Sequence, residues 1–249
     1  MITKSINGRF AIKPMAFSKF EKHLLESNRP LSEALLFLLT WIASSDGKVD
    51  QKELEFIFGI SDSHKVDIDV NTYLDSCRNL DAIRLACKIA QDTFAGEKAY
   101  LFIQMIIGIV IADGQLATSE NYILRFLASV VGLTAQELNK AFRETASRPL
   151  PEPADPSRRE WWEKYEQAKR RQHKNERSRK KSETKKSKAL AVLGLEDTAS
   201  PDEIKKTFQR LAKVHHPDRF ACLGEEAVCA ATQTFVRIKE AYEYLVTNA

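Results

Sequence analysis

Long apolar runs are missing from this sequence of 249 residues. The two longest candidates, Leu31–Ala43 and Leu101–Ala112, span only 13 and 12 residues, whereas a helix that crosses a bilayer needs about 18–20. The first 17 residues also lack the apolar centre of a signal peptide. We therefore expect a soluble, cytoplasmic protein without a transmembrane segment, and we interpret both runs as buried core helices.

Cysteine is scarce, and its spacing does not suit a zinc site. The four cysteines include no C-x-x-C pair, which excludes zinc-ribbon spacing, and we expect reduced thiols that mostly fill core space. A Gly-rich phosphate loop, a nucleophile elbow and a zinc-hydrolase motif are missing too. We therefore expect that the chain is not an enzyme, has no catalytic residues and requires no cofactor.

Glycine and proline are also rare, with 9 and 8 residues respectively. Long stretches of Ala, Leu, Ile, Glu and Lys favour helices over strands. Apolar residues recur at spacings of three and four through residues 17–42, 80–89 and 122–130. Thr134 and Glu137 form a capping box that begins a further helix. These patterns predict an all-α fold, with a first helical domain over residues 1–147.

A proline-rich stretch at 147–157 stops this helical domain. Residues 148–186 are interpreted as a basic, partly helical linker. Residues 151–188 contain fourteen Lys and Arg against seven Asp and Glu, a net charge of +7 in a chain whose total is +4. The linker's one apolar feature is Trp161, Trp162 and Tyr165. A nucleic-acid-binding linker is one reading of this segment, but we favour a solvated charged spacer.

Residues 187–249 are predicted to be a compact helical unit. A short helix over about 187–193 ends at Gly194, and a second begins with Ser200 as N-cap, Pro201 at its first position and Glu203 closing a capping box. A third runs from about 225 to 246. The apolar stripes of the second and third helices predict an antiparallel hairpin. Basic residues line another face of the second helix at a spacing of four and three: Lys206, Arg210 and Lys213.

Two stretches of the first domain resemble each other. "IASSDGKVDQKELEFI" (42–57) and "VIADGQLATSENYIL" (110–124) each read apolar helix, Asp-Gly, and Glu seven residues after the Asp. Aliphatic residues at the first ligand positions exclude an EF-hand. Either the glycines end helices and the glutamates cap the next ones, or the four carboxylates converge on a divalent cation that offsets their repulsion. The candidate metal ligands are Asp46, Glu53, Asp113 and Glu120.

This repeat resembles the tellurite-resistance TerB-like family, whose doubled helical units carry the same D-G-x-x-x-x-x-E pattern. The resemblance covers roughly residues 30–145. It implies a helical bundle and associates the acidic residues with metal. We expect this domain to be a targeting, client-selecting or metal-responsive module.

The stretch "KVHHPDRF" (213–220) raises the question of what its histidines, proline and aspartate do. Metal binding, acid–base chemistry and a rigid recognition loop are all chemically open to them. The context is "LGL" after a short helix, "ASPDEIKKTFQRLAKVHHPDR", and "FVRIKEAYEYL" as a returning helix. This context resembles the J domain of DnaJ-type co-chaperones over about residues 188–247.

The resemblance implies a co-chaperone that docks on a DnaK-type (70-kDa heat-shock) chaperone and stimulates its ATP hydrolysis. Proline fixes the loop and lowers the entropy lost when a partner binds it, and an aspartate in it can accept a charge-assisted bond from a partner arginine. A basic helix would steer an acidic partner. The expected chaperone-binding residues are His216, Pro217, Asp218, Lys206, Arg210, Lys213 and Arg219.

Several features depart from the standard J domain. The aromatic pair that usually precedes "LG" is replaced by Ala189–Val192, and the segment 219–231 is longer than usual. His215 continues the helical register four residues after Leu211, so we expect it to pack or cap rather than to contact a partner. No Gly/Phe-rich or zinc-binding repeat is present, so the client-binding parts of DnaJ are missing. The pairing of TerB-like and J domains resembles the DjlA-type co-chaperones, but we do not expect their N-terminal membrane span here.

Overall fold

The computed structural model describes residues 18–46, 70–112, 114–153, 157–159, 162–163 and 185–248. All regular secondary structure in these ranges is helical, which confirms the predicted all-α class. None of the described helices is long and apolar enough to cross a membrane. All four cysteines are free thiols.

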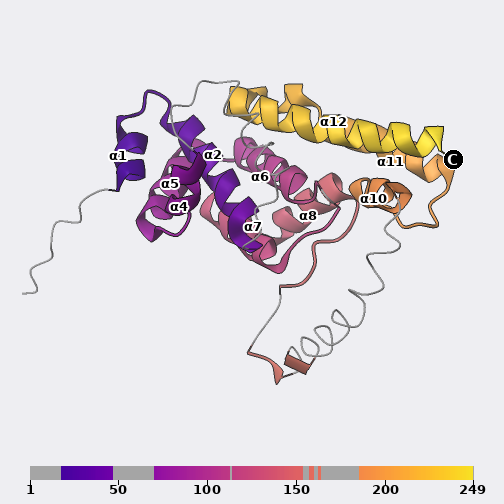
Figure 1. Cartoon of the computed structure of the whole chain (residues 1–249), viewed down its shortest axis with the longest axis horizontal. Helices are drawn as coiled ribbons and strands as arrows, with labels where there is room; N and C mark the ends of the chain where they lie inside the picture. Colours follow the sequence, from indigo (N-terminus) through magenta and orange to yellow (C-terminus); the bar gives the residue numbers. More distant parts are fainter. Residues whose placement is uncertain are drawn as a thin grey trace, which may run out of the picture.

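The N-terminal part is a bundle of short helices (Figure 1). Its elements, labelled as in that figure, are α1 (Lys19–Glu26), α2 (Pro30–Ala43), η1 (Ser44–Asp46), α4 (Val70–Ser76), α5 (Leu80–Thr93), α6 (Glu97–Val110), α7 (Thr118–Val130) and α8 (Ala135–Ala146).

Local sequence explains where several of these helices begin. Pro30 occupies the first position of α2, where its missing N–H costs nothing. The Asn79 side chain accepts hydrogen bonds from the amides of residues 81 and 82 at the start of α5. The predicted capping box of Thr134 and Glu137 begins α8, and its hydrogen bonds lower the pKa of Glu137. These local signals determine the residues at which the helices begin.

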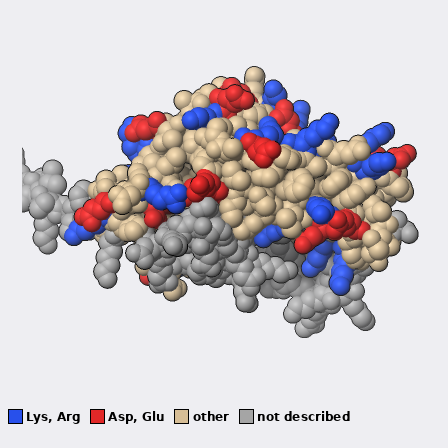
Figure 2. Space-filling model, turned by 90° about the horizontal axis from the view of Figure 1, so that it is seen from above, with Lys and Arg blue, Asp and Glu red and all other residues tan. Residues whose placement is uncertain are grey.

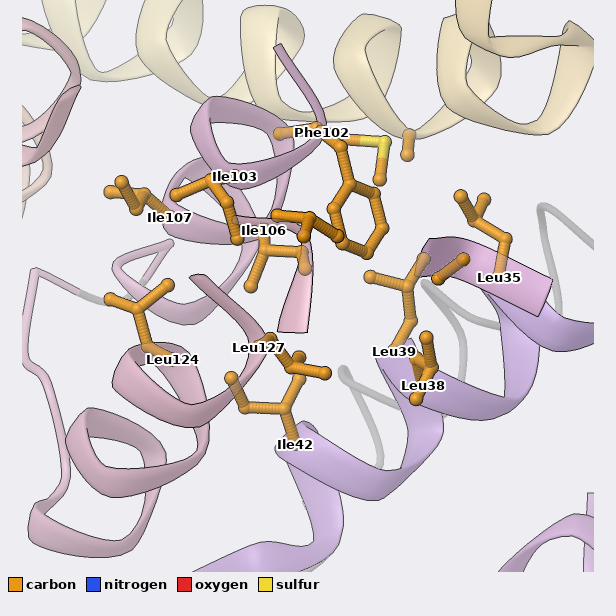
Figure 3. Close-up of a cluster of buried hydrophobic side chains, with 14 of the residues drawn as sticks. Leu35, Leu38, Leu39, Ile42, Phe102, Ile103, Ile106, Ile107, Leu124 and Leu127 are labelled. Atoms are coloured by element: carbon orange, nitrogen blue, oxygen red, sulfur yellow. The ribbon is translucent and has the colours of Figure 1, made fainter. Parts of the chain in front are cut away.

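The core of the bundle lies between α2, α6 and α7 (Figure 3). Both runs that were too short for a membrane span supply it, because residues of α2 and α6 are buried around most of the helix. Figure 3 shows side chains of α2, α6 and α7 gathered between the three helices: Leu35, Leu38, Leu39, Ile42, Phe102, Ile103, Ile106, Ile107, Leu124 and Leu127.

The C-terminal part contains α10 (Lys185–Val192), α11 (Pro201–Val214), the 3-10 helix η2 (Pro217–Leu223) and α12 (Glu225–Thr247). The predicted capping box of Ser200 and Glu203 begins α11, and α12 returns alongside it. Phe208 and Tyr242 stack between the two helices, with ring centroids 4.0 Å apart. A small core completes this unit: Ala189, Leu190, Leu193, Ile204, Leu211, Ile238, Ala241 and Leu245.

The two parts share the helix α12, which extends along the bundle in Figure 1. Its second half packs on α10 and α11, whereas its first half contacts α6 and α2. Phe220 and Leu223 of η2, together with Ala227 and Ala230 of α12, belong to the same buried cluster as the core of the N-terminal bundle. The long segment between loop and third helix therefore attaches the C-terminal unit to the bundle.

Candidate functional site

The loop His216-Pro217-Asp218 follows α11 and includes the first two residues of η2. The helix α11 ends at Val214, and the amide of His215 still donates to the carbonyl of Leu211 at 2.8 Å. His216 is extended, with φ −62° and ψ 127°, and its Nδ1 accepts a 3.3 Å hydrogen bond from the amide of Asp218. Pro217 is the first residue of η2. The loop is thus a short turn held by a proline and by a side-chain cap.

The functional groups of this turn face outward. The Asp218 side chain is 89% exposed and the His216 side chain 50% exposed, with Oδ2 of the former 3.6 Å from Nδ1 of the latter. The imidazole also meets the ring of Phe235 in α12 edge-on, with centroids 6.1 Å apart. The carboxylate of Asp218 is therefore accessible to a partner, whereas the ring of His216 packs against Phe235.

The basic residues of α11 have different environments. Lys206 and Lys213 are exposed, but the guanidinium of Arg210 turns toward the bundle and donates to the carbonyl of Glu144 and to the hydroxyl of Ser147. On the face of the molecule seen in Figure 2, basic and acidic side chains are interspersed. The accessible positive charge of α11 is therefore carried by its exposed lysines and is not part of a uniformly basic face.

Arg219, directly after the loop, also contacts the bundle. Its guanidinium donates to the carbonyl of Val214 and, at 3.1 Å, to Oε1 of Gln104 in α6. The amide nitrogen of Gln104 in turn donates to the Glu144 carboxylate at 3.0 Å. The sequence analysis did not predict these contacts. The one sign of them in the sequence is Gln104, a single polar residue inside the apolar stretch of α6.

His215 is buried between the two parts. Only 2% of the residue is exposed, and its Nε2 lies 3.2 Å from the carbonyl of Thr145. Burial lowers the pKa of His215 to about 4; the bond to Thr145 opposes this shift, and the charges of Arg219 and Arg210 reinforce it. The residue therefore packs and caps, as the helical register predicted, and it is neutral near pH 7.

An open cleft of about 450 Å³ lies between α8 and α11. It is lined by Arg143, Glu144, Ser147, Leu195, Thr207, Arg210 and Val214. The end of α8 and α11 therefore do not pack completely against each other, and Arg210 makes its contacts at the edge of this cleft.

The acidic repeat is only partly described. Glu53 and Asp113 lie outside the described residues, as does the side chain of Asp46. The Glu120 carboxylate accepts a 2.7 Å hydrogen bond from the amide of Ala117 at the start of α7, and Gly114 adopts φ +83° after α6. Both are the features expected of a helix end followed by a capped helix. No cluster of three metal-ligating side chains occurs within the described ranges, and the metal site stays a prediction.

Of the linker's aromatic residues, the structure describes Trp162, which is exposed; Trp161 and Tyr165 lie outside the described residues. The same is true of most of the basic cluster, at 164–184. The choice between a spacer and a nucleic-acid-binding segment therefore stays a prediction.

Comparison with known proteins assigns both parts of the chain. Residues 189–249 match the family model of the DnaJ domain, and residues 32–143 match that of the tellurite resistance protein TerB. No solved structure matches.

Three relatives illustrate the similarity. The chain is 25% identical over 229 residues to the co-chaperone protein DjlA of Coxiella burnetii, covering 84% of this chain and 73% of that protein. It is 40% identical over 56 residues to the adaptation to cold protein J of Shewanella oneidensis, covering 22% of this chain and 60% of that one. It is 50% identical over 54 residues to the chaperone protein DnaJ of Leptothrix cholodnii, covering 22% of this chain and 13% of that one.

The chain thus covers less than two thirds of the last two relatives, whereas the alignment with DjlA covers 84% of the chain and so includes parts of both matched regions. The exposed His216-Pro217-Asp218 loop lies within the matched DnaJ domain. The chain thus contains a J domain in its C-terminal part and a TerB domain in its N-terminal part.

Proposed function

We propose that this J-domain protein is a co-chaperone that docks on a DnaK-type chaperone and stimulates its ATP hydrolysis. One observation carries the proposal: the exposed carboxylate of Asp218 stands on a turn fixed by Pro217 and by the His216 cap. A pre-organised turn loses little entropy on binding, and an exposed carboxylate suits a bidentate bond from a partner arginine.

The role proposed for the chain is regulatory. The loop and α11 would contact the partner, and the partner would supply the nucleotide site and the chemistry, so the effect on hydrolysis is allosteric. Lys206 and Lys213 are exposed on α11 and would attract an acidic surface near the loop. We propose a cytoplasmic location, and that the TerB domain selects a client or a place of action.

The test is the steady-state ATPase rate of a DnaK-type chaperone with increasing amounts of the full-length protein. Wild type should raise the rate, and Asp218→Asn should weaken docking about tenfold or more, since a hydrogen bond to a charged group contributes about 1.5–3 kcal/mol. His216→Gln should weaken it as well, because the brace against Phe235 is lost.

The matched control is Asp197→Asn, which removes an exposed aspartate from the same domain, in the turn before α11. This variant should stimulate like wild type, and all variants should keep the wild-type circular dichroism spectrum. Normal stimulation by both Asp218→Asn and His216→Gln would refute the proposal.

A further inference from the structure

The residues that flank the recognition loop are held by the TerB domain on both sides. Before the loop, Arg210 donates to the Glu144 carbonyl and the Ser147 hydroxyl, and after it Arg219 donates to Oε1 of Gln104 at 3.1 Å. The sequence assigned both arginines to chaperone binding. In the structure their guanidinium groups are engaged within the chain.

The acceptors at the end of α8 are suited to a cation. The carbonyls of residues 144 and 145 belong to the last turn of this helix, where unpaired carbonyls and the helix dipole favour positive charge. The side chain of Glu144 adds a carboxylate, which Tyr100 and Gln104 fix with hydrogen bonds of 2.9 and 3.0 Å. An acidic partner would offer Arg210 the same kind of acceptor.

The surface of α6 is shaped for this contact. Gln104 is completely buried, yet both ends of its amide are used, one toward Glu144 and the other toward Arg219. One turn later stands Gly108, where an added Cβ would lie only 2.9 Å from Cε1 of His215. Gln104 and Gly108, four positions apart on α6, thus lie next to Arg219 and His215, the residues on either side of the loop.

The backbones also meet closely at two other points. A Cβ on Gly114 would lie 2.5 Å from Cβ of Ala191, and one on Gly194 would lie 2.3 Å from the carbonyl oxygen of Ala146. Together with the buried side chains of η2, these approaches make the contact between the domains a packed interface rather than a loose encounter.

We propose that the end of α8 and Gln104 form an intramolecular acceptor site that holds Arg210 and Arg219 and thereby competes with the chaperone for them. The inference rests on the proposed function. While Arg210 and Arg219 are held in this way, the chaperone meets Asp218 and the lysines of α11 but not the two arginines. Release of the guanidinium groups, without separation of the packed domains, strengthens docking.

The test removes part of the acceptor site of Arg210 without disturbing the fold. Ser147→Gly removes one acceptor at a residue with φ +61°, which glycine adopts readily. Glu144→Gln removes the nearby charge and keeps an oxygen for Tyr100 and Gln104. In the double variant, the concentration of full-length protein that gives half-maximal ATPase stimulation should fall about fivefold or more, in the usual range of allosteric couplings.

Arg210→Ala added to this double variant should abolish the gain, because the freed guanidinium is its source. A second route goes through the other arginine: Gln104→Met keeps the volume of the side chain, removes the acceptor of Arg219 and should also lower the half-maximal concentration. Melting temperatures identify variants that fail to fold.

A lower half-maximal concentration in the double variant and in Gln104→Met, lost on addition of Arg210→Ala to the double variant, would support the acceptor site. An unchanged half-maximal concentration in both the double variant and Gln104→Met, or a gain that survives Arg210→Ala, would overturn the competition. Asp218→Asn is measured beside them: if it stimulates normally, the proposed function fails first, whereas its loss of stimulation together with unchanged interface variants rejects the acceptor site alone.

Discussion

The burial of His215 makes the stability of the protein depend on pH in a way that one substitution can isolate. The folded state holds this histidine with a pKa of about 4, whereas an unfolded chain gives it about 6.5. Between these values the unfolded state binds more protons, so stability rises with pH. The contribution is complete above about pH 6.5 and is lost as pH falls toward 4.

The magnitude follows from the difference between the two pKa values. Linkage gives a loss of about 2 kcal/mol by pH 5 and about 3 kcal/mol by pH 4, relative to pH 7. The physical cause is that protonation would place a charge inside a buried site that already faces Arg210 and Arg219, with the Thr145 carbonyl as the opposing acceptor.

Urea unfolding followed by circular dichroism, repeated at pH 7, 6, 5 and 4, measures this loss. Carboxylates titrate in the same range, so the comparison is with His215→Gln, whose amide can still donate to Thr145 but takes up no proton. Wild type should lose about 3 kcal/mol more than this variant between pH 7 and pH 4. Parallel curves for the two proteins would show that His215 is not buried in this way.

Two further predictions concern α6 and the acidic repeat. Gly108→Ala should lower the free energy of unfolding by about 1 kcal/mol, since the Cβ meets His215 at 2.9 Å and overpacking outweighs the gain in helix propensity; an unchanged or higher urea midpoint would contradict this. Calorimetric titration with Mg²⁺, Ca²⁺ and Mn²⁺ tests the cation hypothesis, which expects a saturable heat that both Asp113→Asn and Glu120→Gln abolish; no heat with any of the three ions would reject it.

Local signals in the sequence predicted local structure well. The capping boxes at Thr134 and Ser200 begin helices where expected, and Gly114 and Gly194 adopt the left-handed conformation that follows a helix. These features depend on interactions between residues within four positions of one another, so a short stretch of sequence is enough to predict them. The turn at Pro217 was accessible to the same reasoning.

The contacts between the domains were not predictable in this way. Arg210 lies 66 residues from Glu144, and Arg219 lies 115 residues from Gln104. Helical periodicity placed Arg210 on one face with the exposed lysines, because it records the face of a residue and not the neighbour that this face meets. The roles of the buried Gln104 amide and of Gly108 can be recognised only once the J-domain residues that pack on them, Arg219 and His215, are known.

The position of α12 has a consequence for the order in which the protein can fold during synthesis. Phe220, Leu223 and Ala227 are synthesised long after residues 20–150, yet they are buried in the same cluster as the core residues of that N-terminal part. Until α12 has been synthesised, the apolar faces of α2 and α6 that it contacts stay uncovered. Domains generally fold as units from the N-terminus during translation, but here residues of η2 and α12 complete the core of the N-terminal bundle.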